Sequence, residues 1–138
     1  MFELHKKKHS IDSFEMVTLS TRGMRCADDY EIVKKDNTAE VSQYRISYRE
    51  GKEDRILMRR AAVSKNDILQ LLNNCSILSW DGFHGKHPRG VKDGIMFSFS
   101  ATVNGGKTIK ADGSQNFPKH YRDYSQALHD ILSNEIEI

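Results

Sequence analysis

The chain has 138 residues, of which 38% are hydrophobic and 29% charged, and this composition fits one ordinary globular domain and excludes a disordered or fibrous protein. The formal net charge of +2 argues against a dedicated nucleic-acid binder, because such proteins concentrate Lys and Arg. No apolar run approaches the ~20 residues of a membrane span, and no apolar stretch follows the basic N-terminus to form a signal peptide, so we expect a cytoplasmic protein. Cys26 and Cys75 match no metal-binding spacing; we expect free thiols, with one disulfide as the alternative in a secreted chain.

The first half of the chain predicts a flexible start followed by strands. Residues 1–13 are polar and basic, so we expect them to fray and the single domain to span residues 14–138. In the third predicted strand, Tyr44, Ile46 and Tyr48 alternate with polar residues, and this period of two predicts that they form its buried face. Short apolar, β-prone runs predict four strands, at Phe14–Leu19, Tyr30–Lys35, Val41–Arg49 and Arg55–Val63.

A first helix is predicted to begin after Ser64. Ser64 is a favourable N-cap, and Asp67 falls in the first turn, where a carboxylate interacts well with the helix dipole. Apolar residues follow at helical spacing, and Asn73–Asn74 ends the pattern. We therefore expect an amphipathic helix here, with its apolar stripe facing the sheet.

The second half predicts a hairpin and a second helix. Ile95–Val103 alternates as a half-buried strand, and Asn104–Gly106 is a strong hairpin signal that returns the chain at Lys107–Ala111. Asp112–Ser114 is interpreted as a second turn. Pro118 suits the first position of a helix that ends near Leu132. The apolar stripe of that helix consists of Tyr121, Tyr124, Leu128, Ile131 and Leu132.

These elements together predict an α+β fold. We expect a mostly antiparallel sheet of about five or six strands, with two amphipathic helices packed on one face. The expected order is strands, helix, strands, helix. No internal repeat or low-complexity segment is present.

The stretch from Trp80 to Pro118 carries a pattern of Trp-x-Gly-Phe, then Asp-Gly before an aromatic-rich strand, then Gly-Ser-x-Asn-aromatic-Pro. The residues are Trp80, Gly82, Phe83, Asp93, Gly94, Phe97, Gly113, Ser114, Asn116, Phe117 and Pro118. This pattern resembles one found in small bacterial domains of unknown function. The resemblance implies a fold and carries no activity.

The loop between Gly82 and Lys92 is the first candidate site, because nothing in the folding pattern requires its histidines and basic residues. As a ligand-binding patch, for a small anion or a protein partner, it would use basic and aromatic side chains. Those residues are Trp80, Phe83, His84, Lys86, His87 and Arg89. As a metal site, it would use His84, His87 and Asp93.

Two other sequence patterns each have a functional and a structural interpretation. Gly106–Thr108 matches the end of a phosphate-binding loop, but Ala101 stands where the first glycine is needed and the segment joins two strands, so we interpret it as a hairpin turn. Arginines on adjacent strands could merge into a positive stripe that contacts nucleic acid, or could simply keep an exposed face soluble. These arginines are Arg45, Arg49, Arg55, Arg59 and Arg60.

The functional hypothesis is a non-enzymatic binding or interaction module, because no Ser or Cys has a His and a carboxylate at a recognisable catalytic spacing. The first alternative is a small metal-dependent hydrolase that uses His84 and His87. The second is a nucleic-acid-associated domain that uses the arginine face, although nucleic acid is the less favoured partner. We expect no cofactor, a protein or a small anionic ligand as partner, and a homodimer as an open alternative.

Overall fold

The computed structural model describes residues 10–24 and 26–133. These residues form one seven-stranded sheet with the strand order β4-β3-β2-β1-β6-β7-β5, so the sequence prediction of five or six strands was too low. All neighbouring strands are antiparallel except β5 and β7, which are parallel. The strands are β1 (Phe14–Arg22), β2 (Ala27–Lys34), β3 (Ala39–Arg49), β4 (Lys52–Val63), β5 (His84–Gly85), β6 (Met96–Val103) and β7 (Lys107–Ser114).

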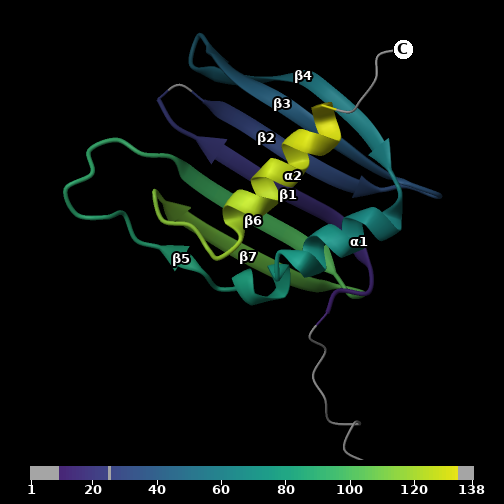
Figure 1. Cartoon of the computed structure of the whole chain (residues 1–138). Helices are drawn as coiled ribbons and strands as arrows, with labels where there is room; N and C mark the ends of the chain where they lie inside the picture. Colours follow the sequence, from purple (N-terminus) through teal and green to yellow (C-terminus); the bar gives the residue numbers. More distant parts are fainter. Residues whose placement is uncertain (1–9, 25, 134–138) are drawn as a thin grey trace, which may run out of the picture.

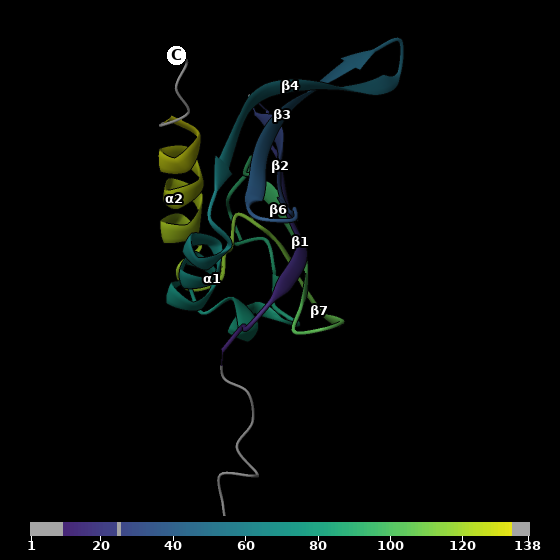
Figure 2. The same cartoon turned by 90° about the vertical axis from the view of Figure 1, so that its right-hand side faces the viewer.

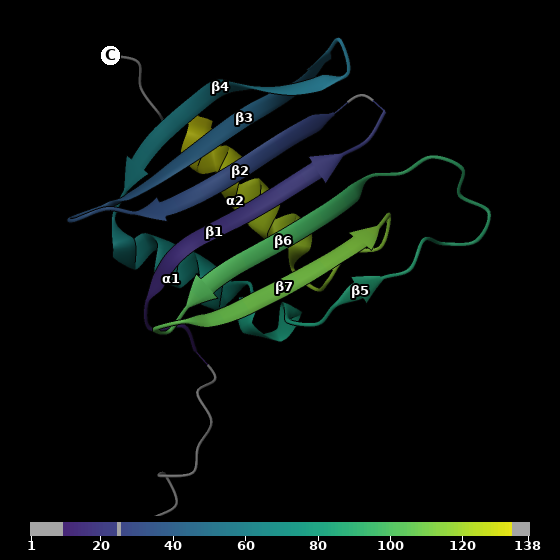
Figure 3. The ribbon, with the colours of Figure 1, turned by 180° about the vertical axis from the view of Figure 1, so that it is seen from behind.

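Two helices lie on one face of the sheet, as the sequence predicted (Figure 1). They are α1 (Lys65–Asn74) and α2 (Tyr121–Ser133), and the short 3-10 helix η2 (Ile77–Trp80) follows α1. Seen edge-on, the helices stand on one side while the tip of the β3–β4 hairpin leans toward the other (Figure 2). No helix of the described residues lies on the opposite face of the sheet (Figure 3). None of the described helices is long and apolar enough to cross a membrane.

The hydrophobic core lies between the sheet and the helices. Trp80 is buried in it, its indole Nε1 donates to the Lys119 carbonyl at 3.0 Å, and its ring meets those of Phe99 and Tyr124 edge-on. Because the buried indole N–H has a partner, the large ring is buried without a lost hydrogen bond. The sheet and α2 supply many of the other large buried side chains, among them Val17, Leu19, Ile32, Val41, Leu128 and Leu132.

The expected buried face of β3 was wrong. Val41 and Gln43 face the helices, in register with Ile32 and Tyr30 of β2, whereas Tyr48 lies on the other face and is 63% exposed. Only Ile46 of the predicted apolar set is buried, and it lies outside the main core. The alternation from Tyr44 to Tyr48 therefore predicted the wrong inner face for β3. The reason is that the polar Gln43 lies on the inner face.

The start of α1 confirms the cap prediction. The Ser64 hydroxyl accepts a hydrogen bond from the backbone N–H of Asp67 at 3.0 Å, which satisfies one of the orphan donors of the first turn. Ile68 and Leu72 are the buried residues of this helix. Both cysteines are free: Cys75 is buried and Cys26 is half-buried.

Two asparagine side chains tie down the start of the described chain. The Asn73 amide accepts from the N–H of Ile11 and donates to its carbonyl, and Ile11 is buried in the core. Asn104 Oδ1 accepts from the N–H groups of Asp12 and Ser13. Asn104 and Gly105 have positive φ, at 49° and 77°, as expected for a type I′ hairpin turn. The predicted flexible segment, residues 1–13, lies mostly outside the described residues.

Two boundaries in the second half differ from the prediction. Asp112–Ser114 is not a turn but the end of β7, where Gly113 is so close to the Asn116 carbonyl and the Phe97 ring that a Cβ would lie 2.3 Å from the former and 2.8 Å from the latter. Helix α2 begins at Tyr121, three residues after Pro118, because the chain first makes a turn closed by the Tyr121 N–H and the Pro118 carbonyl.

Candidate ligand-binding cleft

A cleft of about 330 Å³ opens between α2 and the inner face of the sheet, near the ends of β1 and β2. Its walls combine hydrogen-bonding side chains with aromatic and aliphatic ones. The lining residues are Thr21, Cys26, Asp28, Tyr30, Ile95, Phe117, Tyr121, Ser125 and His129. A neighbouring hollow of about 490 Å³ shares Ile95, Phe117, Tyr121 and Ser125 with it, so the cleft continues along the side of α2.

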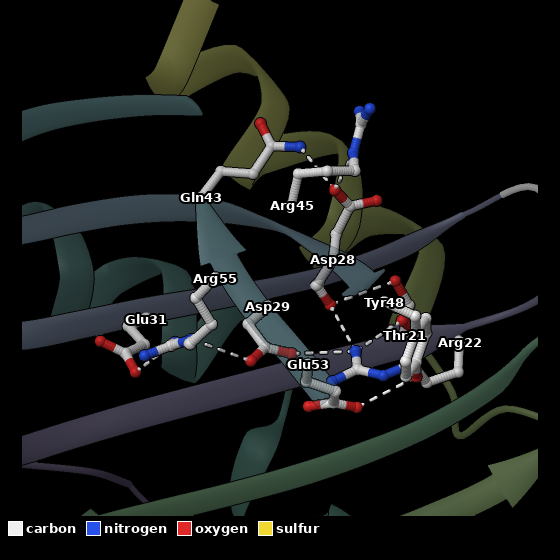
Figure 4. Close-up of polar contacts among 10 residues, drawn as sticks. All are labelled: Thr21, Arg22, Asp28, Asp29, Glu31, Gln43, Arg45, Tyr48, Glu53 and Arg55. Atoms are coloured by element: carbon white, nitrogen blue, oxygen red, sulfur yellow. Dashed lines mark hydrogen bonds and ion pairs between the residues drawn. The ribbon is translucent and has the colours of Figure 1, made fainter. Parts of the chain in front are cut away.

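Asp28 is the buried carboxylate of the cleft, with 7% of its surface exposed. Its Oδ1 accepts from Gln43 Nε2 at 3.3 Å and from Arg45 Nε at 3.1 Å (Figure 4). None of the described residues donates to its Oδ2. A carboxylate has about four acceptor positions, so Asp28 keeps acceptor capacity on the second oxygen.

Gln43 connects this carboxylate to α2. Its Nε2 also donates to the Tyr30 hydroxyl at 3.4 Å, and its Oε1 accepts from Arg59 Nε at 2.8 Å. The Arg59 guanidinium then reaches α2, at 3.3 Å from His129 Nδ1 and 3.4 Å from Ser133 Oγ. Because an arginine only donates, His129 Nδ1 must accept, and a neutral His129 ring carries its proton on Nε2.

Tyr121 forms the aromatic wall of the cleft. Its ring stacks on Phe117, with 4.5 Å between centroids and 23° between planes, and lies 6.0 Å from Trp80 on the core side. Burial raises the pKa of the Tyr121 hydroxyl, and burial together with the nearby Asp28 carboxylate raises the pKa of Tyr30. Both hydroxyls therefore stay protonated at neutral pH and can donate a hydrogen bond.

The helix supplies its cleft residues at a regular spacing. Tyr121, Ser125 and His129 are each four residues apart, so they lie on one side of α2, and Ser133 continues the row. The core stripe of Tyr124, Leu128 and Leu132 runs beside it. This polar row is a sequence signal that could have found the site, but the aromatic Tyr121 was assigned to the apolar stripe.

Sequence reasoning missed the sheet half of the cleft for a different reason. Asp28 and Asp29 lie within β2, whereas the sequence predicted that this strand begins only at Tyr30. Gln43 and Arg45 were placed on the outer face, whereas they face the helices with Asp28. A buried polar cluster on an inner face has the same alternation as an exposed face, so periodicity alone does not separate the two.

The residues of the predicted site around the Gly82–Lys92 loop do not form one cluster in the structure. Trp80 is a core residue and Phe83 packs against the core beside Phe97. His84 Nδ1 pairs with Asp112 Oδ1 at 2.5 Å. His87 is held at both ring nitrogens, by Ser114 Oγ at 2.7 Å and by the Val91 carbonyl at 2.5 Å.

His84, Lys86 and His87 nevertheless line one hollow of about 410 Å³, together with residues of β6 and β7. Arg89 and Asp93 are exposed and are not among its lining residues. Within the described part of the chain, no group of three or more His, Cys, Asp and Glu side chains could hold a metal ion, so His84, His87 and Asp93 do not converge in one.

The strand arginines do not form a single stripe. Arg45 and Arg59 lie on the inner face, bonded to Asp28 and Gln43. Arg55 lies on the outer face, where it pairs with Asp29 at 3.3 Å and Glu31 at 2.8 Å (Figure 4). Arg60 is also on the outer face, 3.6 Å from Glu40. Each of these four cations is therefore bonded to a carboxylate or an amide of the sheet.

No family model, curated protein or solved structure matches the chain. The resemblance of the stretch from Trp80 to Pro118 to bacterial domains therefore gains no support from the comparisons.

Proposed function

We propose that the chain is a non-enzymatic binding module and that its ligand is a small, flat, neutral molecule with N–H donors, held in the cleft between α2 and the sheet. One observation carries this proposal: Asp28 is a buried carboxylate in the wall of a cleft, and its Oδ2 accepts no hydrogen bond from the described residues. Every buried side-chain N or O atom of the described residues has a partner, so the unpartnered Oδ2 is accessible and a ligand N–H group can donate to it.

The charge balance supports a neutral ligand. The Arg45 guanidinium bonds the same carboxylate, so the Asp28–Arg45 pair carries no net charge and offers a cation little attraction. The remaining polar groups of the wall are hydroxyl, thiol and imidazole groups, from Thr21, Cys26, Tyr30, Tyr121, Ser125 and His129. These groups suit hydrogen bonding to a heterocycle.

The shape of the cleft supports a flat ligand of modest size. Ligand pockets typically occupy about 300–1,000 Å³, and a cleft of about 330 Å³ lies at the lower limit. The stacked rings of Phe117 and Tyr121 offer an aromatic surface beside it. One or two fused rings would therefore fit between the aromatic wall and Asp28.

Adenine is a suitable probe because it is flat, neutral and rich in N–H donors. We expect a ¹H–¹⁵N titration with adenine to shift the amide signals of Asp28, Ser125 and His129. Asp28→Asn should weaken binding about tenfold or more, because the Asn amide can keep an acceptor for Gln43 and Arg45 but places a donor where Oδ2 accepts. The matched control Asp112→Asn, in the other hollow, should leave adenine binding unchanged.

Two results would contradict this proposal: equal adenine affinity for Asp28→Asn and the parent chain, or shifts centred on His84 and His87. The second result would favour the other candidate function, binding of a small anion in the hollow lined by His84, Lys86 and His87. Inorganic phosphate is the probe for that alternative, since those three side chains can each carry or share positive charge.

A further inference from the structure

The hydrogen bonds of the Gln43 amide have a fixed direction. Arg59 only donates, so the amide atom that lies 2.8 Å from Arg59 Nε is the oxygen Oε1. The Asp28 carboxylate only accepts, so the amide atom that lies 3.3 Å from Asp28 Oδ1 is the nitrogen Nε2 (Figure 4). Contacts at both ends of the amide therefore set the same orientation, in which Gln43 Nε2 donates to Asp28 and to the Tyr30 hydroxyl.

The Tyr30 hydroxyl consequently has a proton to offer. Its oxygen accepts from Gln43 Nε2 at 3.4 Å, and an amide nitrogen accepts nothing in return. None of the described residues accepts a hydrogen bond from the Tyr30 O–H. Burial and the nearby Asp28 carboxylate raise the pKa of Tyr30, so the proton stays on the oxygen at neutral pH. Because Tyr30 lines the cleft, it provides a donor for a ligand.

An acceptor and a donor therefore lie side by side in the wall of the cleft. Asp28 Oδ2 accepts from none of the described residues. The Asp28 carboxylate and the Tyr30 hydroxyl lie 3.3 and 3.4 Å from the same Gln43 nitrogen, so they are neighbours. The ligand edge that complements this pair carries an N–H donor and an acceptor separated by one carbon. Amino-substituted nitrogen heterocycles and cyclic lactams both have such an edge.

We infer that the cleft recognises a ring edge with an N–H donor and an acceptor separated by one carbon, the donor bonding to Asp28 Oδ2 and the acceptor taking the hydrogen bond of the Tyr30 O–H. The inference rests on the proposed function, because it adds a second contact to the same ligand. A ligand with the donor alone leaves the Tyr30 O–H without an acceptor. A ligand with the acceptor alone leaves Asp28 Oδ2 without a donor, so both lose affinity relative to one that has the full edge.

Three flat, neutral compounds of two fused rings separate the two contacts. Indole carries the N–H donor alone, 1-methyl-7-azaindole carries the acceptor nitrogen alone, and 7-azaindole carries both, separated by one carbon. A ¹H–¹⁵N titration of the parent chain with each compound gives its dissociation constant. We expect 7-azaindole to bind about three- to tenfold more tightly than indole. The methylated compound should bind most weakly, because the lost hydrogen bond to the charged Asp28 is the stronger one.

Tyr30→Phe removes the donor and keeps the ring. The affinity of 7-azaindole divided by that of indole should then fall to about one, and this ratio cancels any loss common to both compounds, including the acceptor that Gln43 loses. The matched control is Tyr48→Phe, on the other face of the sheet and 63% exposed, and it should leave the ratio unchanged. The comparison of the three compounds needs only the parent chain, so it decides the matter even where Tyr30→Phe does not fold.

Equal affinities of indole and 7-azaindole for the parent chain, or a ratio that Tyr30→Phe leaves unchanged, would overturn the inference. If indole still bound and Asp28→Asn weakened it, the proposed function would stand without the second contact. If Asp28→Asn left the affinities of all three compounds unchanged, both would fail. Where the ratio behaves as expected, tighter binding of 9-methyladenine than of 9-methylhypoxanthine assigns the edge to an amino heterocycle, and the reverse order assigns it to a lactam.

Discussion

The two parts of the layer beneath α2 differ in how they fill the space between helix and sheet. One part is an apolar core, where Tyr124 and Leu128 pack with Trp80 and Phe99. The other is the cleft, where Asp28, Gln43 and Arg59 form a polar chain across the sheet to His129. Helix α2 covers both parts. The packing of the helix on the sheet therefore does not explain why the cleft is polar while the core is apolar.

This difference is the reason for our proposal that the polar part has a role other than stability. Buried polar groups contribute little net stability compared with well-packed apolar side chains, and an unsatisfied one is costly. Every buried side-chain N or O atom of the described residues has a partner, yet the accessible Oδ2 of Asp28 has none among them. Predictions that separate the two parts therefore test whether the cleft is a site or an imperfect core.

The largest effect is expected in the apolar part. Leu128→Ala should lower the free energy of unfolding by about 2–5 kcal/mol, because it leaves a cavity in the core. Ile131→Ala, at a half-buried position on the same helix, is the matched control and should cost clearly less. Urea unfolding followed by circular dichroism measures both. Equal losses in the two variants would show that the core does not end where the structure places it.

An intermediate effect is expected in the polar part. Gln43→Leu should cost about 1–3 kcal/mol, because Arg59 Nε loses its acceptor and Asp28 loses a donor inside the protein. Gln70→Leu, on the exposed side of α1, should change stability by less than about 0.5 kcal/mol. A Gln43→Leu variant that is more stable than the parent and no longer binds adenine would sharpen the comparison further, since it would show stability given up for binding.

The sequence predicted the folding signals better than the site. The Ser64 cap, the positive φ of Asn104 and the buried stripe of α2 each have a local cause within a few residues, so they could be recognised without the fold. The cleft depends on Asp28, Gln43 and Ser125 meeting across β2, β3 and α2. Only the tertiary structure brings those segments together. Polar residues on a strand were assumed to face solvent, and at Gln43 that assumption failed.

The smallest predicted effect concerns tyrosine ionisation, and it distinguishes the two parts by pH. Burial raises the pKa of the Tyr124 hydroxyl in the core, so the folded chain keeps a proton that the unfolded chain loses above pH 10. The stabilisation this gives is fully present below pH 10 and is lost as the pH rises further. Burial raises the pKa of Cys75 as well, so the thiol adds to the same alkaline loss.

Tyr124→Phe removes the tyrosine part of this loss. Parent and variant should have similar free energies of unfolding at pH 7, and at pH 10.5 the variant should retain about 0.8 kcal/mol of the stability that the parent loses. Tyr30→Phe, in the polar part, should already cost stability at pH 7, because Gln43 Nε2 loses an acceptor. If Tyr124→Phe showed the neutral-pH loss and Tyr30→Phe did not, the assignment of the apolar and polar parts would have to be reversed.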